Sequence, residues 1–310
     1  MTQHRVHCTL SDLLALRPQG QRLSLRFDLR TLEKAAGGHL SRLRGRGLEF
    51  CEHRVYQAGD DLRAIDWKVT ARRRQPYTKV FHEEIEQPLV LIVDQRLPMF
   101  FGSRHRFKAT LAAEVAALLL WAGLHQNDRV GGLILGTGST PGFKPVRQPQ
   151  RALRFLQALS ACNLALRHDL DAPAEPSLVD ALHEARRLIR PGGLCFVISD
   201  WSDWDTDTAA ALAELNRHHQ SIAIQVFDPL EKALPTGRFA ISDGRQPFRL
   251  ELENSATLGI LNQALAAHLE SLPQRLAVLG TPCIPLSTWE DPAASLGRLS
   301  AEPRRGGVHV

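Results

Sequence analysis

The densest group of charged side chains that could do chemistry lies between residues 45 and 72. Three carboxylates, those of Asp60, Asp61 and Asp66, lie there among Arg54, Arg63, Lys68 and Arg72. Gly59 predicts a tight turn just before Asp60. Adjacent carboxylates rarely converge on one bond, as a general acid and base must. The pattern therefore favours a network of ion pairs or a docking surface over a hydrolytic pair, although all three interpretations remain open.

A second pair of carboxylates follows two apolar runs of strand length. Asp94 ends the run 88–94 and Asp200 ends the run 194–200. The carboxyl ends of strands in an open α/β sheet meet at one edge, where ligands bind. Arg96, two residues past Asp94, is long enough to turn back and pair with Asp94 or Asp200 through its planar fork. The sequence therefore predicts a cationic side chain between these carboxylates.

Apolar runs and helical patterns alternate along the chain from residue 88. Further strands are predicted at 129–135 and 221–227, with a weaker one at 276–285. Helices are predicted between them, at 106–125, 150–159, 177–190, 206–219 and 256–272. Unalternating apolar strands separated by helices are typical of a mostly parallel sheet that helices cover on both faces. The predicted fold class is therefore α/β.

The predicted domain boundaries follow this change of pattern. Residues 1–87 are expected to form a basic extension, helical first and then β-rich, and residues 88–285 the α/β domain. Residues 286–310 are expected to be a flexible tail, because turn formers dominate the end of the sequence. Residues 1–79 contain 16 Lys and Arg residues against 8 Asp and Glu residues. Nucleic-acid binding through 1–79 is thus an alternative, although Arg72-Arg73-Arg74 has no interleaved aromatic residues.

Composition excludes several classes of protein. The five cysteines are widely spaced and form no C-x-x-C pair, which argues against a disulfide framework or a zinc cluster. The longest apolar stretch, 111–124, is shorter than the roughly 20 residues of a membrane span and contains Glu114. We therefore expect a cytoplasmic protein without a membrane partner.

The segment 47–72 resembles a family catalogued as domain of unknown function 58. The shared pattern is G-x-E-F-x-x-x-R-x-Y-x-x-G-D-D-x-R-x-I-D-W-x-x-x-A-R. The matching residues are Gly47, Glu49, Phe50, Arg54, Tyr56, Gly59, Asp60, Asp61, Arg63, Ile65, Asp66, Trp67, Ala71 and Arg72. The resemblance extends over roughly residues 40–230 and implies a von Willebrand factor A-like domain. It also implies a chaperone or adaptor that works with a MoxR-type AAA+ ATPase on other protein complexes.

The resemblance raises the question of a metal. In von Willebrand A-like domains the first strand ends in D-x-S-x-S, whose oxygens hold Mg²⁺ with a Thr and an Asp from other strand ends. Here Arg96 and Pro98 replace the two serines, and residues 169–177 contain no Thr, although Asp200 matches the late Asp. A hard dication needs several oxygen ligands. We therefore expect a degenerate site at Asp94, Arg96, Pro98 and Asp200 that holds no metal.

The functional hypothesis is a non-enzymatic adaptor, without a cofactor, that binds a MoxR-type AAA+ ATPase and an unidentified client protein. A metal-dependent ligand-binding or hydrolytic domain is the alternative of another class. Indole rings next to a strand end are typical of a partner contact. The loop 201–204 is therefore a second candidate surface, besides the motif at 47–72. The expected partner-binding residues are Arg54, Tyr56, Gly59, Asp60, Asp61, Arg63, Asp66, Trp67, Trp201 and Trp204.

Overall fold

The computed structural model describes residues 5–25, 53–55, 70, 77–79, 88–136, 138, 140–166, 176–242 and 247–299. The chain divides into two compact units. One contains residues 1–43 and 87–310, and the other contains residues 44–86. In the smaller unit, β1 (His53–Val55) pairs with β2 (Tyr77–Lys79) in an antiparallel ladder, so a β element is present where the sequence predicts one.

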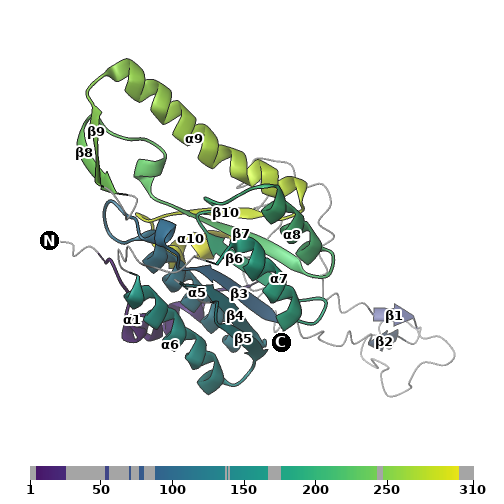
Figure 1. Ribbon diagram of the computed structural model, residues 1–310. Coiled ribbons are helices and arrows are strands. Elements are labelled where there is room, and N and C mark those ends of the chain that lie inside the picture. Colours follow the sequence, from purple (N-terminus) through teal and green to yellow (C-terminus); the bar gives the residue numbers. More distant parts are fainter. Residues whose placement is uncertain are drawn as a thin grey trace. The chain divides into compact units, whose positions relative to one another are not determined.

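A six-stranded sheet forms the centre of the larger unit (Figure 1). Its spatial order is β10-β7-β6-β3-β4-β5, and every neighbouring pair is parallel except β4 with β5. The strands are β3 (Leu89–Asp94), β4 (Val130–Leu135), β5 (Gly142–Val146), β6 (Leu194–Ser199), β7 (Gln220–Phe227) and β10 (Cys283–Ser287). The predicted mostly parallel α/β sheet is therefore confirmed. The last strand lies later than the sequence indicates, because the helix before it extends to Val278.

Helices cover both faces of this sheet, as Figure 1 shows. Alternate residues of β3 divide between two cores: Leu91 and Val93 join one, and Val90 and Ile92 join the other. The helices of the larger unit are α1 (Leu10–Ala15), α2 (Arg17–Gly20), α5 (Lys108–His125), α6 (Pro149–Ala165), α7 (Leu178–Leu188), α8 (Thr206–Asn216), α9 (Ser255–Val278) and α10 (Pro292–Leu299). The first core contains residues of α1, α5, α6 and α10, and the second contains residues of α7, α8 and the C-terminal part of α9.

Helix α5 is buried around almost its whole circumference. Its residues from Lys108 to Gly123 are all buried, because α2, α6, α10 and the sheet surround it. A helix that is apolar on every side belongs in the centre of a core. No helix in the described part of the chain is long and apolar enough to cross a membrane, and α5 itself contains the buried Glu114.

The N-terminal and C-terminal segments differ from the predicted domain boundaries. Residues 5–25 pack onto the α/β domain, where Leu13 is fully buried and the backbone N–H of Cys8 donates to Asn163 Oδ1 at 2.7 Å. Residues 292–299, expected in a flexible tail, form α10, whose buried Leu296 joins the same core as α5. Isolated apolar residues such as Leu13 and Leu296 give too weak a periodic signal to reveal such packing from sequence alone.

An arm follows β7, and the sequence predicts its helix, at 256–272, but not the two strands before that helix. The arm consists of the short 3-10 helix η3 (Pro229–Glu231), the antiparallel strands β8 (Gly237–Ser242) and β9 (Pro247–Leu252), and helix α9. Pro273 lies inside α9 and cannot donate a hydrogen bond to the carbonyl of Leu269. The Nε2 group of Gln225, on β7, donates to that carbonyl at 3.2 Å instead. The sheet therefore anchors α9 at the point where its own hydrogen-bond ladder is interrupted.

Candidate functional site

The candidate site lies at the carboxyl edge of the sheet, where β3, β6 and β7 end. Asp94 is the last residue of β3, and Asp200 follows the neighbouring parallel strand β6. This is the placement that the sequence predicts. Asp94 is 1% exposed, so its charge must be compensated inside the protein.

Arg96 compensates the charge of Asp94. Its Nη2 and Nε groups donate to the two Asp94 oxygens at 2.7 Å and 3.0 Å, and the Ser199 hydroxyl donates to Oδ2 at 2.7 Å. The Nη1 group of Arg96 also donates to Asp203 Oδ2 at 2.6 Å and to the carbonyl of Pro176 at 3.3 Å. Arg96 thus ties the end of β3 to the loop after β6 and to the start of α7.

Asp200 has a different partner from the one considered in the sequence analysis. The Nζ group of Lys108 donates to Asp200 Oδ2 at 2.7 Å and to Glu231 Oε1 at 2.6 Å. The alternative in which Arg96 pairs with Asp200 is therefore wrong. The reason is that Lys108, at the start of α5, is already beside Asp200, while Asp94 and Asp203 occupy the guanidinium of Arg96.

The position of Lys108 is determined by these carboxylates rather than by its helix. A lysine in the first turn of a helix opposes the helix dipole, and Lys108 is the first residue of α5. Only 3% of its side chain is exposed. A buried ammonium is retained when well-placed carboxylates surround it, which here are those of Asp200 and Glu231.

The directions of the pKa shifts agree with two ion-pair clusters, one around Arg96 and the other around Lys108. Burial raises the pKa of the Asp94 carboxyl, and the bonds from Arg96 oppose that rise. Burial also disfavours charged Arg96 and charged Lys108, but their carboxylate partners outweigh it and raise the pKa of both side chains. For Asp200, the charge of Lys108 overcomes the effect of burial and lowers the pKa. Both cations therefore stay charged within their clusters.

The loop after β6 is held in a strained conformation. Trp201 has a φ of 58°, in the left-handed region that a bulky residue rarely adopts, and it is 1% exposed. Its backbone N–H donates to Ser199 Oγ at 3.1 Å, and its ring lies 5.9 Å from that of Trp204, centroid to centroid. Strain of this kind persists only where surrounding contacts enforce it, and it gathers at functional sites. Trp204 is half-buried, so of the two predicted indoles it is the one that a partner could contact.

The residues at this edge do not fit a Mg²⁺ ion. The guanidinium of Arg96 lies against both oxygens of Asp94, so a fixed cation already occupies the side of that carboxylate that a metal would use. Pro98 lies exposed in the short 3-10 helix η2 (Leu97–Met99) and has no side-chain oxygen to offer. In the described part of the chain, no group of three or more His, Cys, Asp or Glu residues is arranged to hold a metal.

The motif between residues 47 and 72 lies almost entirely outside the described residues. Tyr56, Gly59, Asp60, Asp61, Arg63, Asp66 and Trp67 are not described, and of Arg54 only the backbone, in β1, is described. Its role therefore stays a prediction.

Sequence reasoning missed two members of the two clusters, Lys108 and Glu231, and did not predict that a third, Asp203, pairs with Arg96. One signal was available for Lys108, since it is the single lysine at the beginning of a long apolar stretch and one of only six in the chain. Asp203 lies within the loop 200–204, whose indoles and acidic groups make it a candidate surface, but the sequence does not show that Asp203 pairs with Arg96. Glu231 gave no signal, because nothing in the sequence relates η3 to the start of α5.

A comparison with protein-family models shows to which family this chain belongs. Residues 52–261, about two thirds of the chain, match the model of the family described as "Protein of unknown function DUF58". The chain belongs to this family. Among curated proteins, the DUF58 chain is 29% identical to the uncharacterized protein Rv1480 of Mycobacterium tuberculosis over 322 residues, which cover 99% of both chains. The uncharacterized protein Mb1516 of Mycobacterium bovis matches to the same extent.

Two solved structures are similar to this chain at low sequence identity. BatB from Bacteroides thetaiotaomicron is 14% identical with a TM-score of 0.40, over 62% of this chain and 98% of that one. The SpRpn10 VWA domain is 13% identical with a TM-score of 0.38, over 68% and 94% of the two chains. The strand order and the parallel ladders of the DUF58 chain itself define a mostly parallel α/β architecture, the fold class expected for a von Willebrand A-like domain.

Proposed function

We propose that this DUF58 protein is a non-enzymatic adaptor that binds a MoxR-type AAA+ ATPase and a client protein in the cytoplasm. It would act in the assembly or activation of the client complex. The observation that carries the proposal is the internal pairing of the charges at the carboxyl edge of the sheet. Arg96 and Lys108 engage Asp94, Asp200, Asp203 and Glu231, which leaves a rigid, preorganised rim.

This pairing favours recognition over chemistry at the rim. A general base must be able to reach and accept a substrate proton, and both oxygens of Asp94 already accept hydrogen bonds in a buried place. A rigid rim with a half-exposed indole instead suits a protein interface, where aromatic residues carry much of the binding energy. Membership of the DUF58 family supports the same proposal through the association that the motif implies.

Sedimentation of purified protein with the MoxR-type ATPase of the same organism tests the proposal. We expect the two proteins to sediment together in the presence of ATP. Moderate salt should not dissociate the complex. A control with an unrelated AAA+ ATPase should give no complex. The absence of a complex with the MoxR-type ATPase, whether ATP, ADP or no nucleotide is present, would contradict the proposed function.

A further inference from the structure

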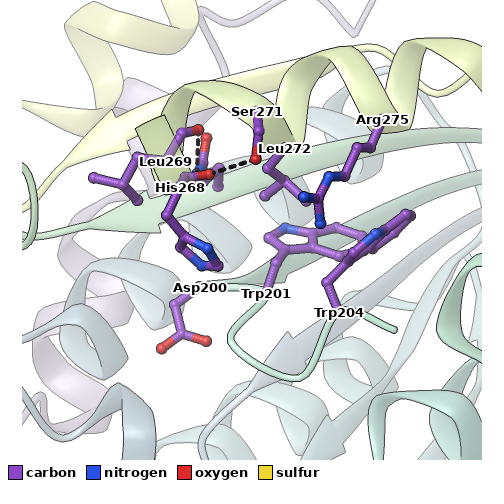
Figure 2. A pocket seen from close by; sticks show the side chains of 9 residues that line it. Asp200, Trp201, Trp204, His268, Leu269, Ser271, Leu272 and Arg275 are labelled. Atoms are coloured by element: carbon purple, nitrogen blue, oxygen red, sulfur yellow. Dashed lines mark hydrogen bonds between the residues drawn. The ribbon is translucent and has the colours of Figure 1, made fainter. Parts of the chain in front are cut away.

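A small notch lies between the loop after β6 and helix α9. Its lining includes Asp200, Trp201 and Trp204 from the loop, and His268, Leu272 and Arg275 from the helix. We call it the α9 notch. Figure 2 shows the side chains of His268 and Arg275 directed from α9 toward the loop, with the two indole rings beneath Arg275. Because His268 and Arg275 are seven residues apart, two helical turns place them on one face of α9.

The notch is lined by one carboxylate, that of Asp200, and one guanidinium, that of Arg275, which have different partners. The carboxylate of Asp200 is bonded to Lys108 Nζ at 2.7 Å and to the backbone N–H of Ser202 at 3.1 Å, so its charge is already compensated. His268 and Arg275 are exposed, and no carboxylate within the described residues pairs with either side chain. The guanidinium of Arg275 therefore offers hydrogen-bond donors that no anion among the described residues occupies.

The size of the notch restricts what can enter it. Its cavity volume is about 10 Å³, room for about one water molecule. Pockets for cofactors or drug-sized ligands are far larger, on the order of 300–1,000 Å³. The hollow is therefore too small to enclose a ligand, and a partner's side chain would lie at its mouth, beside Arg275 and the half-exposed Trp204.

We infer that the α9 notch binds an acidic side chain, Asp or Glu, of a partner protein. A carboxylate satisfies the planar donor fork of Arg275 through two hydrogen bonds, and the partner's aliphatic carbons pack against Trp204. The hydrogen bond from the Trp201 backbone N–H to Ser199 Oγ helps to hold the loop and its indoles at the notch. This inference rests on the proposed adaptor function, for which it names the chemistry of the contact.

Chemical shifts of the tryptophan indole N–H groups test the inference without the ATPase. The chain has five tryptophans, and Trp204→Phe assigns the signal of Trp204. The probe is hexaglutamate, with hexaglutamine at the same ionic strength as its control. We expect hexaglutamate alone to shift the Trp204 signal saturably, and Arg275→Gln to reduce that shift at least fivefold. Arg154→Gln, at an exposed arginine of α6, should leave it unchanged.

Three results would overturn the inference: no shift of the Trp204 signal with hexaglutamate, an equal shift in Arg275→Gln, or an equal loss in Arg154→Gln. Sedimentation with the MoxR-type ATPase then separates this inference from the proposed function. Equal binding of the ATPase by wild type and Arg275→Glu would leave the proposed function intact and contradict the notch as its contact. A peptide response without any ATPase binding would support the notch and contradict the proposed function.

Discussion

Arg96 and Asp94, two residues apart at the end of β3, form an ion pair through two hydrogen bonds of 3.0 Å and 2.7 Å. The two side chains can meet because the chain turns sharply after the strand. In this turn the backbone N–H of Arg96 donates to Asp94 Oδ1 at 3.0 Å. The guanidinium is therefore placed by the backbone as well as by its own charge. It compensates a carboxylate that is buried on every side.

Arg96→Met should destabilise the protein strongly. The substitution leaves the Asp94 carboxylate buried with no cation, and breaking a buried pair from one side costs about 3–5 kcal/mol. Chemical denaturation at neutral pH measures the free energy of unfolding. Arg298→Met is the matched control, because its pair with Glu290 is exposed and should be worth about 1 kcal/mol or less. Equal losses in the two variants would show that Arg96 does not compensate Asp94.

Lys108→Met should also destabilise, by about 3–5 kcal/mol, because it orphans the buried carboxylate of Asp200. Lys232→Met is its control, since Lys232 pairs with Glu270 at the surface. The expected loss for the control is about 1 kcal/mol or less. A Lys108→Met variant as stable as the control would mean that the ammonium contributes nothing net to the cluster.

Gln225 and Pro273 should show energetic coupling. Gln225→Ala removes the donor to the Leu269 carbonyl and should cost about 1 kcal/mol. Pro273→Ala restores a backbone N–H that can bond this carbonyl within α9, so Gln225→Ala should cost less in that background. A double-mutant cycle of unfolding free energies measures the difference. Additive effects would show that Gln225 does not replace the missing helical bond.

His219 should make stability depend on pH. Burial, with the nearby charges of His218 and Arg186, lowers the pKa of His219 below its usual value near 6.5. The unfolded state then binds more protons between the folded and unfolded pKa values, so stability is full above about pH 6.5 and decreases as the pH falls below it. Unfolding free energies of wild type and His219→Gln between pH 5 and 8 check this, with the exposed His183→Gln as control. A pH dependence that is identical in wild type and His219→Gln would contradict the assignment.

The layers of the fold could be predicted because each depends on a local pattern. The run of apolar residues in β3 predicts a strand, and the turn residues after α7 predict the end of that helix. In the arm after β7, the strands β8 and β9 were not predicted, although Phe248, Leu250 and Leu252 of β9 alternate with polar residues. The helix was predicted at 256–272, but not its continuation to Val278, because Pro273 argues against one continuous helix. Tertiary contacts, such as that of Gln225 with Leu269, stabilise the helix there.

The candidate site could be predicted only in part, for a related reason. Asp94 and Arg96 are neighbours in sequence, so the geometry of one strand end was enough to expect their pairing. Lys108, Asp200 and Glu231 come from three separate elements, and their cluster depends on how α5 and η3 pack at the edge of the sheet. No pattern within one segment contains that information.

Thermal unfolding in the presence of Mg²⁺ tests most directly whether fixed cations take the place of a metal at this edge. A ligand that binds the folded state raises the melting temperature. We predict that Mg²⁺, added at constant ionic strength, leaves the melting temperature of the wild type unchanged. Arg96→Ser, which returns a hydroxyl and removes the guanidinium, should melt at a lower temperature and gain a Mg²⁺-dependent increase. A wild-type melting temperature that rises with Mg²⁺ would contradict the account, because the edge of the sheet would then hold a metal despite Arg96 and Lys108.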